Sequence, residues 1–365
     1  MKKRQVNFEL LRILCMYMIV LGHCLFHGRV TAKLGYGTTN YFLSYLIQSF
    51  SVVHVNCFVM LAGYFAIDGT FRMQRPLKIW KQVFFYGAVI CLFAGLTVGV
   101  EGKDVLLAVF PISARNYWFA SVYMGLVFLM PFLGMTAVRL TKKQYQYLLL
   151  LLALFLSVNH MFFRVDTYGT YTGRDLPWFV FLALLAGYIK LHTEENRTYF
   201  WYGLLGYAAA SLGVLASVYL SVELHLEDMG YFLNYHSPLA LLATGSLFLS
   251  VKNMPWKESH ADSVILKTAG AAFGVYLIHD NYLIRYLVWD TFRASKVART
   301  HWAVIYAVGI SLLVYAVCTG LELGRQKLFR SVGVWYEKTR WYQKEQALCE
   351  YVNGIVQEGK ESAHG

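Results

Sequence analysis

The chain has 365 residues, of which 57% are hydrophobic and only 15% are charged. A soluble domain carries about 25% charged residues, so this composition excludes a water-soluble globular enzyme. The formal net charge of +12 also occurs in nucleic-acid-binding proteins, but an unequal distribution of Lys and Arg across a membrane accounts for it without nucleic acid.

Ten apolar segments are long enough to cross a bilayer, which requires about 20 residues each. Their connections are short and leave no room for a soluble catalytic domain. The sequence therefore predicts an all-α fold, a polytopic membrane helical bundle of about ten transmembrane helices in contact with the lipid bilayer. In chain order the segments span roughly 7–27, 43–67, 79–100, 117–138, 145–163, 176–192, 199–221, 235–251, 267–289 and 301–324.

Lys and Arg are more frequent in every second connection between these segments. If the N-terminus is cytoplasmic, inside segments hold 15 of the 33 before the C-terminal tail, the tail adds 7, and outside loops hold 9. By the positive-inside rule, both termini are expected in the cytoplasm. We expect an integral membrane domain over residues 1–325 and a cytoplasmic polar tail over 326–365.

The tail repeats Trp341, Leu348, Val352 and Ile355 at helical spacing. This pattern is typical of an amphipathic helix on the inner membrane surface, although a frayed polar tail fits it equally well. The six cysteines have neither a disulfide framework nor a zinc-type spacing, so no metal site is predicted.

The first segment contains two polar residues that are costly inside a membrane. Arg12 and His23 are eleven residues apart, which places them within about 20° of one face of a helix and roughly 16 Å apart along its axis. Met16 and His27 share this stripe, and Glu9 is the expected partner of Arg12. An arginine that extends to the inner surface and a hydrogen-bonded histidine are the structural alternative.

Five motifs in register resemble the membrane acyltransferase 3 family. Arg12 and His23 match the Arg-x10-His of its first span, HVNCFVMLAGYF (54–65) matches an apolar segment, and the sequence Arg72-Met-Gln-Arg75 matches a cytoplasmic Arg-x-x-Arg. The segments NYWF (116–119) and GVYLIH (274–279) match two later motifs. Ala62 and Asn56 depart from the family pattern, which commonly has a serine and a proline there.

The resemblance implies a multi-pass enzyme of the bacterial cell (inner) membrane that transfers an acyl group, commonly acetyl from acetyl-CoA, to a hydroxyl of an extracytoplasmic carbohydrate. Acyl-CoA is a donor substrate, and no permanently bound cofactor is expected. The cations of Arg72, Arg75, Lys78 and Lys81 are suited to its phosphates, and Arg12 is the next cation along the path. Basic residues beside a span also follow from topology alone.

We expect His23, Arg12 and His279 to be catalytic. His23 is the general base for the acceptor hydroxyl, and His279, midway along the ninth segment, stabilises the oxyanion or orients the acceptor. Asn116, Tyr117 and Trp118 are expected to contact substrate, although aromatic residues at a span end are often interface anchors. We interpret His54 and His160 as structural.

The alternative function is a transporter or flippase for a glycan or lipid-linked precursor. Such a protein commonly shows inverted repeats or paired broken helices, which are not evident in the sequence. The sequence identifies neither the acceptor glycan nor the position that is modified, and it leaves the oligomeric state open.

Overall fold

The computed structural model describes residues 5–113, 116–163, 167–225 and 230–361. These residues form helices and turns without any strand, which confirms the all-α prediction. A π-helical turn, Leu154–Val158, joins α7 to α8. The helices are α1 (Val6–His27), α2 (Thr39–Ser51), α3 (His54–Ala66), α4 (Gln74–Thr97), α5 (Gly102–Val109), α6 (Trp118–Arg139), α7 (Lys142–Ala153), α8 (Asn159–Phe163), α9 (Leu176–His192), α10 (Arg197–Glu223), α11 (Pro238–Lys252), α12 (Asp262–His279), α13 (Arg285–Thr291), α14 (Ala294–Val297), α15 (Ala303–Tyr336) and α16 (Arg340–Glu361).

Seven helical segments of the described chain are long and apolar enough to cross a membrane. The chain is therefore a multi-pass membrane protein. The other three predicted spans correspond to α9, α11 and α12, which have 17, 15 and 18 residues, so the count of ten remains a prediction. The seven segments are Val6–Lys33, Thr39–Ala66, Gln74–Thr97, Trp118–Arg139, Lys142–Phe163, Arg197–Glu223 and Ala303–Tyr336.

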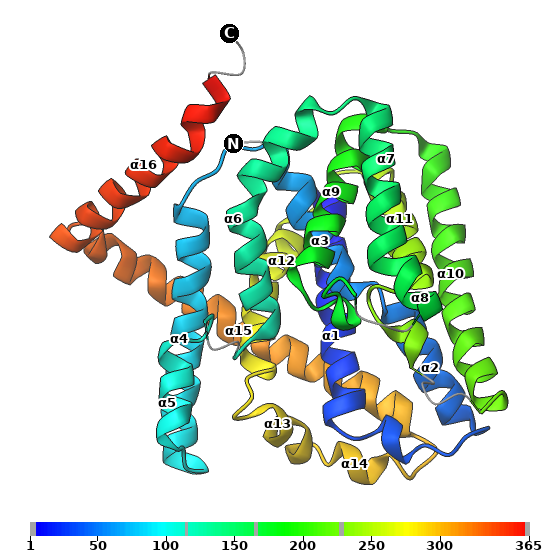
Figure 1. Cartoon of the computed structure of the whole chain (residues 1–365). Helices are drawn as coiled ribbons and strands as arrows, with labels where there is room; N and C mark the ends of the chain where they lie inside the picture. The colour runs from blue at the N-terminus through cyan, green and yellow to red at the C-terminus, as the bar shows by residue number, and fades with distance from the viewer. Residues whose placement is uncertain (1–4, 114–115, 164–166, 226–229, 362–365) are drawn as a thin grey trace.

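Helix α1 passes through the middle of the bundle and packs against α12, α15, α3 and α2 (Figure 1). Between other helices of the bundle, small residues allow the two backbones to lie close together. In α3, a Cβ added at Gly63 would lie 2.5 Å from the Cα of Ala183 in α9. Because lipid tails are as apolar as the helices, close contact of this kind is a main source of helix association in a membrane.

Two predicted spans are interrupted. The segment 43–67 consists of α2 and α3, which are separated by the buried Val52 and Val53. The predicted span 267–289 is wrong beyond residue 279, because α12 ends at His279 and the side-chain oxygen of Asn281 accepts a hydrogen bond from the backbone N–H of Leu283 at 3.0 Å. Such a local side-chain bond competes with helix continuation, so His279 ends its helix rather than lying midway along it.

The tail forms the helix α16, as the spacing of its apolar residues predicted, with Trp341, Leu348 and Ile355 exposed. Its position on the inner membrane surface stays a prediction. The helix folds back over the start of α4, where Lys81 pairs with Glu345 at 2.5 Å. Both ends of the described chain lie toward the end of the bundle where α1 begins (Figure 1). Helix α15 continues through the predicted domain boundary at residue 325 to Tyr336.

A buried carboxylate joins three helices. Glu322 of α15 is fully buried and accepts hydrogen bonds from the guanidinium of Arg325 at 2.6 and 2.8 Å and from the Tyr86 hydroxyl of α4 at 2.6 Å. Its side chain lies directly against Gly274 of α12. A buried charge is tolerated only when such partners satisfy it, so the position of this carboxylate links α4, α12 and α15.

Substituting Gly274→Ala should destabilise the protein, because the new Cβ would lie 2.4 Å from the carboxylate of Glu322. Overpacking of this kind costs about 1–3 kcal/mol. The measurement is the melting temperature of the purified protein in detergent. Gly270→Ala, one turn earlier with no atom within 4 Å of the added Cβ, is the control and should leave that temperature unchanged or raise it. Equal losses for the two variants would contradict the account.

Candidate functional site

Two cavities lie along α1. The first, about 290 Å³ and here named the Arg cavity, lies near the start of the helix, and the second, about 320 Å³ and named the His cavity, lies near its end. The Arg cavity is lined by Arg12, Leu61, Ala62, Phe65, Ala66, Gly69, Thr70, Phe71, Arg72, Arg75, Ile79, Tyr123, Leu126, Val127, Met130 and Pro131. The lining of the His cavity includes Met16, His23, His27, His54, Phe58, Trp118, Arg174, Tyr235, Tyr276, Asp280 and Arg285.

The Arg cavity brings together three of the arginines that the sequence singled out. Arg12 comes from the second turn of α1, while the exposed Arg72 lies just before α4 and the exposed Arg75 lies in its first turn. The Arg12 guanidinium pairs with Glu9 at 2.5 Å, as the i−3 spacing predicted. Lys78 is exposed and lies outside this lining. The cavity therefore holds several guanidinium groups, which bind phosphate by paired, charge-assisted hydrogen bonds.

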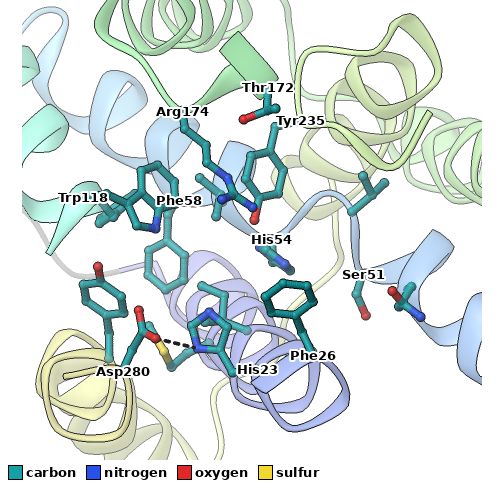
Figure 2. A pocket seen from close by; sticks show the side chains of 18 of the residues that line it. His23, Phe26, Ser51, His54, Phe58, Trp118, Thr172, Arg174, Tyr235 and Asp280 are labelled. Atoms are coloured by element: carbon teal, nitrogen blue, oxygen red, sulfur yellow. Dashed lines mark ion pairs between the residues drawn. The ribbon is translucent and has the colours of Figure 1, made fainter. Parts of the chain in front are cut away.

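The His cavity collects side chains from α1, α2, α3, α6, α12 and α13 and from the segments just before α9, before α11 and after α12. Met16, His23 and His27 all line it, which confirms the predicted stripe on α1. Figure 2 shows His23 at one side of the cavity, beside Asp280. About 23% of the His23 side chain is exposed, so this imidazole is accessible to a molecule in the cavity.

The hydrogen bonds around His23 determine which of its nitrogens carries a proton. His279 Nδ1 lies 2.6 Å from the carbonyl of Val275, and since a carbonyl only accepts, Nδ1 donates there. In the neutral ring the other nitrogen, Nε2, is then an acceptor, and it lies 3.0 Å from His23 Nδ1. His23 Nδ1 must therefore donate, and the lone pair of a neutral His23 is on Nε2. This tautomer leaves Nε2 available as a base.

Asp280 adds a negative charge next to this pair. Its side chain is buried, and Oδ1 lies 3.5 Å from His27 Nε2, 3.6 Å from His23 Nδ1 and 3.9 Å from Arg285 Nη1. A carboxylate at this distance stabilises the imidazolium that forms when His23 takes a proton. Asp280 was not among the predicted site residues, although a carboxylate directly after a motif histidine in an apolar segment is a detectable signal.

One nitrogen each from His23 and His27 and one oxygen from Asp280 lie within 4.8 Å of one another, close enough to ligate a metal ion. Two contacts within the protein disfavour a metal ion here. His23 Nδ1 already contacts His279, and the guanidinium of Arg285 lies beside the same oxygen of Asp280. A metal cation would compete with both of these contacts. The set therefore matches a proton-transfer site better than a metal centre.

The structure places three of the predicted substrate contacts outside the described lining of the His cavity. His279 is buried behind His23 and lies outside the described cavity lining, so it contacts His23 rather than a molecule in the cavity. Tyr117 is also buried: its hydroxyl donates to the Leu277 carbonyl at 2.9 Å and accepts from Asn281 at 2.6 Å. It thus fixes the start of α6 to the end of α12. Asn116 lies outside the described lining too, whereas Trp118 belongs to it, so its contact with substrate stays a prediction.

Three cavity residues were missed by the sequence analysis. His54, interpreted as structural, begins α3 at the break after α2 and lines the His cavity. Arg174 and Tyr235 come from polar loops and face the same space. Neither residue belongs to one of the five sequence motifs. His160 packs against Tyr231 and His236 and lies outside this lining, consistent with a structural role.

The comparisons with known proteins place this geometry in a family. No curated protein and no solved structure matches the chain. The model of the acyltransferase 3 family, described as an acyltransferase domain, matches residues 5–320. This range contains Arg12, Arg72, Arg75, His23 and Asp280, and so includes both cavities. The chain belongs to the acyltransferase 3 family and is a membrane acyltransferase.

Proposed function

We propose that the protein moves an acyl group, acetyl in the simplest case, from cytoplasmic acyl-CoA to a hydroxyl of an extracytoplasmic carbohydrate in a bacterial cell membrane. One observation carries the proposal. The same face of α1 lines a cavity with three arginines near its start and a cavity with an accessible histidine near its end. The donor binds in the Arg cavity, and the acceptor enters the His cavity.

The donor has an anionic nucleotide end and a long, narrow thioester arm. Arg72 and Arg75 hold the phosphates by charge-assisted hydrogen bonds, with Arg12 deeper along the helix. Between the cavities the arm follows α1 and α6, since α6 contributes Trp118 and Phe119 to the His cavity and Tyr123 to the Arg cavity. The distance from Arg12 to His23 is roughly 16 Å along the axis.

In the reaction, Nε2 of His23 removes the proton of the acceptor hydroxyl as its oxygen attacks the thioester carbonyl. The C–S bond then breaks, and the imidazolium returns the proton to the leaving thiolate, which gives the acyl ester and free CoA. Asp280 stabilises the imidazolium. His279 acts as a positioning residue because its bond to His23 keeps the lone pair on Nε2.

Sealed inside-out vesicles test the direction of transfer. Radioactive acetyl-CoA added to their exposed cytoplasmic face should label only acceptor glycan inside the lumen, where added glycosidase cannot reach it, because the two cavities lie toward opposite ends of α1. The measurement is protected label per vesicle. Label on glycan supplied to the same face as acetyl-CoA would overturn the topology, and passage of glycan without any acetyl transfer would favour the transporter.

In the same vesicles, His23→Ala should lower transfer by about 10²–10⁴-fold, the range for loss of a general base. His160→Ala is the matched control, since that histidine lies outside the described His-cavity lining, and it should retain turnover. Acetyl-CoA binding, measured by equilibrium dialysis, should be retained in both variants. Near-normal transfer by His23→Ala would remove His23 from the mechanism.

Replacing His279 separates its effect on His23 from a packing effect. His279→Leu removes the acceptor for the Nδ1 proton of His23 and should lower kcat by roughly the 10²–10⁴-fold of a lost general base, with the KM for acetyl-CoA nearly unchanged. His279→Gln places an amide oxygen close to the position of Nε2 and should recover much of that loss. If both variants lose kcat equally while their melting temperatures match the wild type, the positioning role is wrong.

Substituting Arg72→Ala or Arg75→Ala should raise the KM for acetyl-CoA by roughly 10- to 100-fold, the range for a hydrogen bond to a charged group. Saturated kcat should change much less, because both residues contact a remote part of the donor. Lys78→Ala is the control, since Lys78 lies outside the described Arg-cavity lining. An unchanged KM with a lower kcat in the arginine variants would contradict phosphate binding.

A further inference from the structure

The wall of the His cavity that faces His23 carries an arginine on two aromatic rings. The Cζ atom of Arg174 lies 5.5 Å from the ring centroid of Trp118 and 5.5 Å from that of Tyr235. The two rings are nearly parallel, with an interplanar angle of 16° and centroids 6.4 Å apart. Figure 2 shows Arg174 descending between these rings, across the cavity from Asp280.

Two independent features hold this wall in place. Gly173 has a φ of +74°, and a Cβ there would lie 2.8 Å from the backbone nitrogen of His236 and 3.0 Å from Tyr235 Cβ. Only glycine allows the loop before Arg174 to approach so closely in this conformation. From α3, the buried Asn56 donates to the Tyr235 carbonyl at 2.8 Å and accepts from Trp178 at 3.0 Å. Asn56, one of the departures from the family pattern, thus positions the aromatic wall.

The charges of the cavity lining favour an anion. Among the described lining residues, Arg174 and Arg285 are cationic and Asp280 is the one acid, so the formal sum is +1 with neutral histidines. Asp280 faces His23, His27 and Arg285 at 3.5–3.9 Å, on the opposite side from Arg174. Arg174 lies in the loop before α9 and, as an arginine, keeps its positive charge in the cavity lining.

We propose that Arg174, Trp118 and Tyr235 form a subsite for an anionic sugar, with a carboxylate or phosphate on the acceptor residue. This inference rests on the proposed function and specifies its acceptor class. The planar guanidinium forms paired hydrogen bonds with a carboxylate or phosphate, while the aromatic faces pack against the C–H groups of the sugar ring. The anion fixed at Arg174 directs a ring hydroxyl toward His23.

A binding experiment that needs no turnover tests the subsite with defined probes. Methyl glucuronide, glucose 6-phosphate and neutral methyl glucoside are titrated against the full chain in nanodiscs, with intrinsic tryptophan fluorescence as the readout. At least one anionic probe should bind roughly 10- to 100-fold more tightly than the glucoside, the range for one charge-assisted hydrogen bond. Tighter binding of methyl glucuronide indicates a carboxylate on the acceptor, and tighter binding of glucose 6-phosphate indicates a phosphate.

In Arg174→Gln this preference should disappear, whereas Arg299→Gln should keep it, because Arg299 is exposed and lies outside the described lining. Equal affinity for charged and neutral probes in the wild type, including no binding of any probe, overturns the subsite. So does an anion preference that survives in Arg174→Gln.

A turnover experiment separates this inference from the proposed function. Three samples of surface glycan are prepared from a host strain that lacks the protein: one untreated, one with its carboxylates reduced and one with its phosphates removed. Each sample is incubated with the enzyme and radioactive acetyl-CoA. One of the two treatments should lower labelling by at least 10-fold, and Arg174→Gln should raise the KM for untreated glycan. Labelling that neither treatment reduces contradicts the anionic acceptor but leaves acyl transfer intact. No labelling of untreated glycan contradicts the proposed function itself.

Discussion

The hydrogen bond between His23 and His279 links the first helix of the bundle to the end of α12. His279 is the last residue of α12, and the next residue, the C-cap Asp280, places its carboxylate beside the same imidazole. Two consecutive residues at the end of one helix therefore supply both the hydrogen-bond acceptor and the negative charge next to His23.

Helix α12 is also fixed at a second point. Gly274, five residues before His279, lies against the buried Glu322, whose other partners come from α4 and α15. Since buried polar groups in a membrane must find partners within the protein, these contacts leave α12 little freedom to slide or rotate. Helix α4 carries the Arg75 end of the Arg cavity, so the same carboxylate connects the supports of both cavities.

The sequence predicted those features that depend on a single regular helix. The Arg12–Glu9 pair, the stripe of Met16, His23 and His27, and the amphipathic tail all follow from a period of 3.6 residues. The features that it missed depend on where helices stop or break: the end of α12, which moved His279 behind His23, and the turn at Val52–Val53, which brings His54 to the cavity. At Val52 and Val53 the residues of the turn are themselves apolar, so hydropathy does not mark that break, whereas the polar residues Asp280 and Asn281 do follow the end of α12.

Loop residues set a different limit on prediction. Arg174 and Tyr235 are 61 positions apart in the sequence, and their contact depends on the backbone at Gly173 and on a hydrogen bond from Asn56. No local pattern encodes a contact that needs three separate segments. The motif residues on α1, in contrast, belong to one rigid element, so their relation is readable directly from their spacing.

That rigidity explains why the interval between Arg12 and His23 is informative. Eleven residues bring the two side chains back to within about 20° of one direction, while ten or twelve would leave the second some 80° to 120° away from it. In either case His23 would leave the face of α1 that meets His279 and Asp280, even though the helix and its hydropathy would be unchanged. A histidine elsewhere on α1 would meet lipid or a different helix. The spacing thus specifies both the separation of the two cavities along the axis of α1 and the face on which they open.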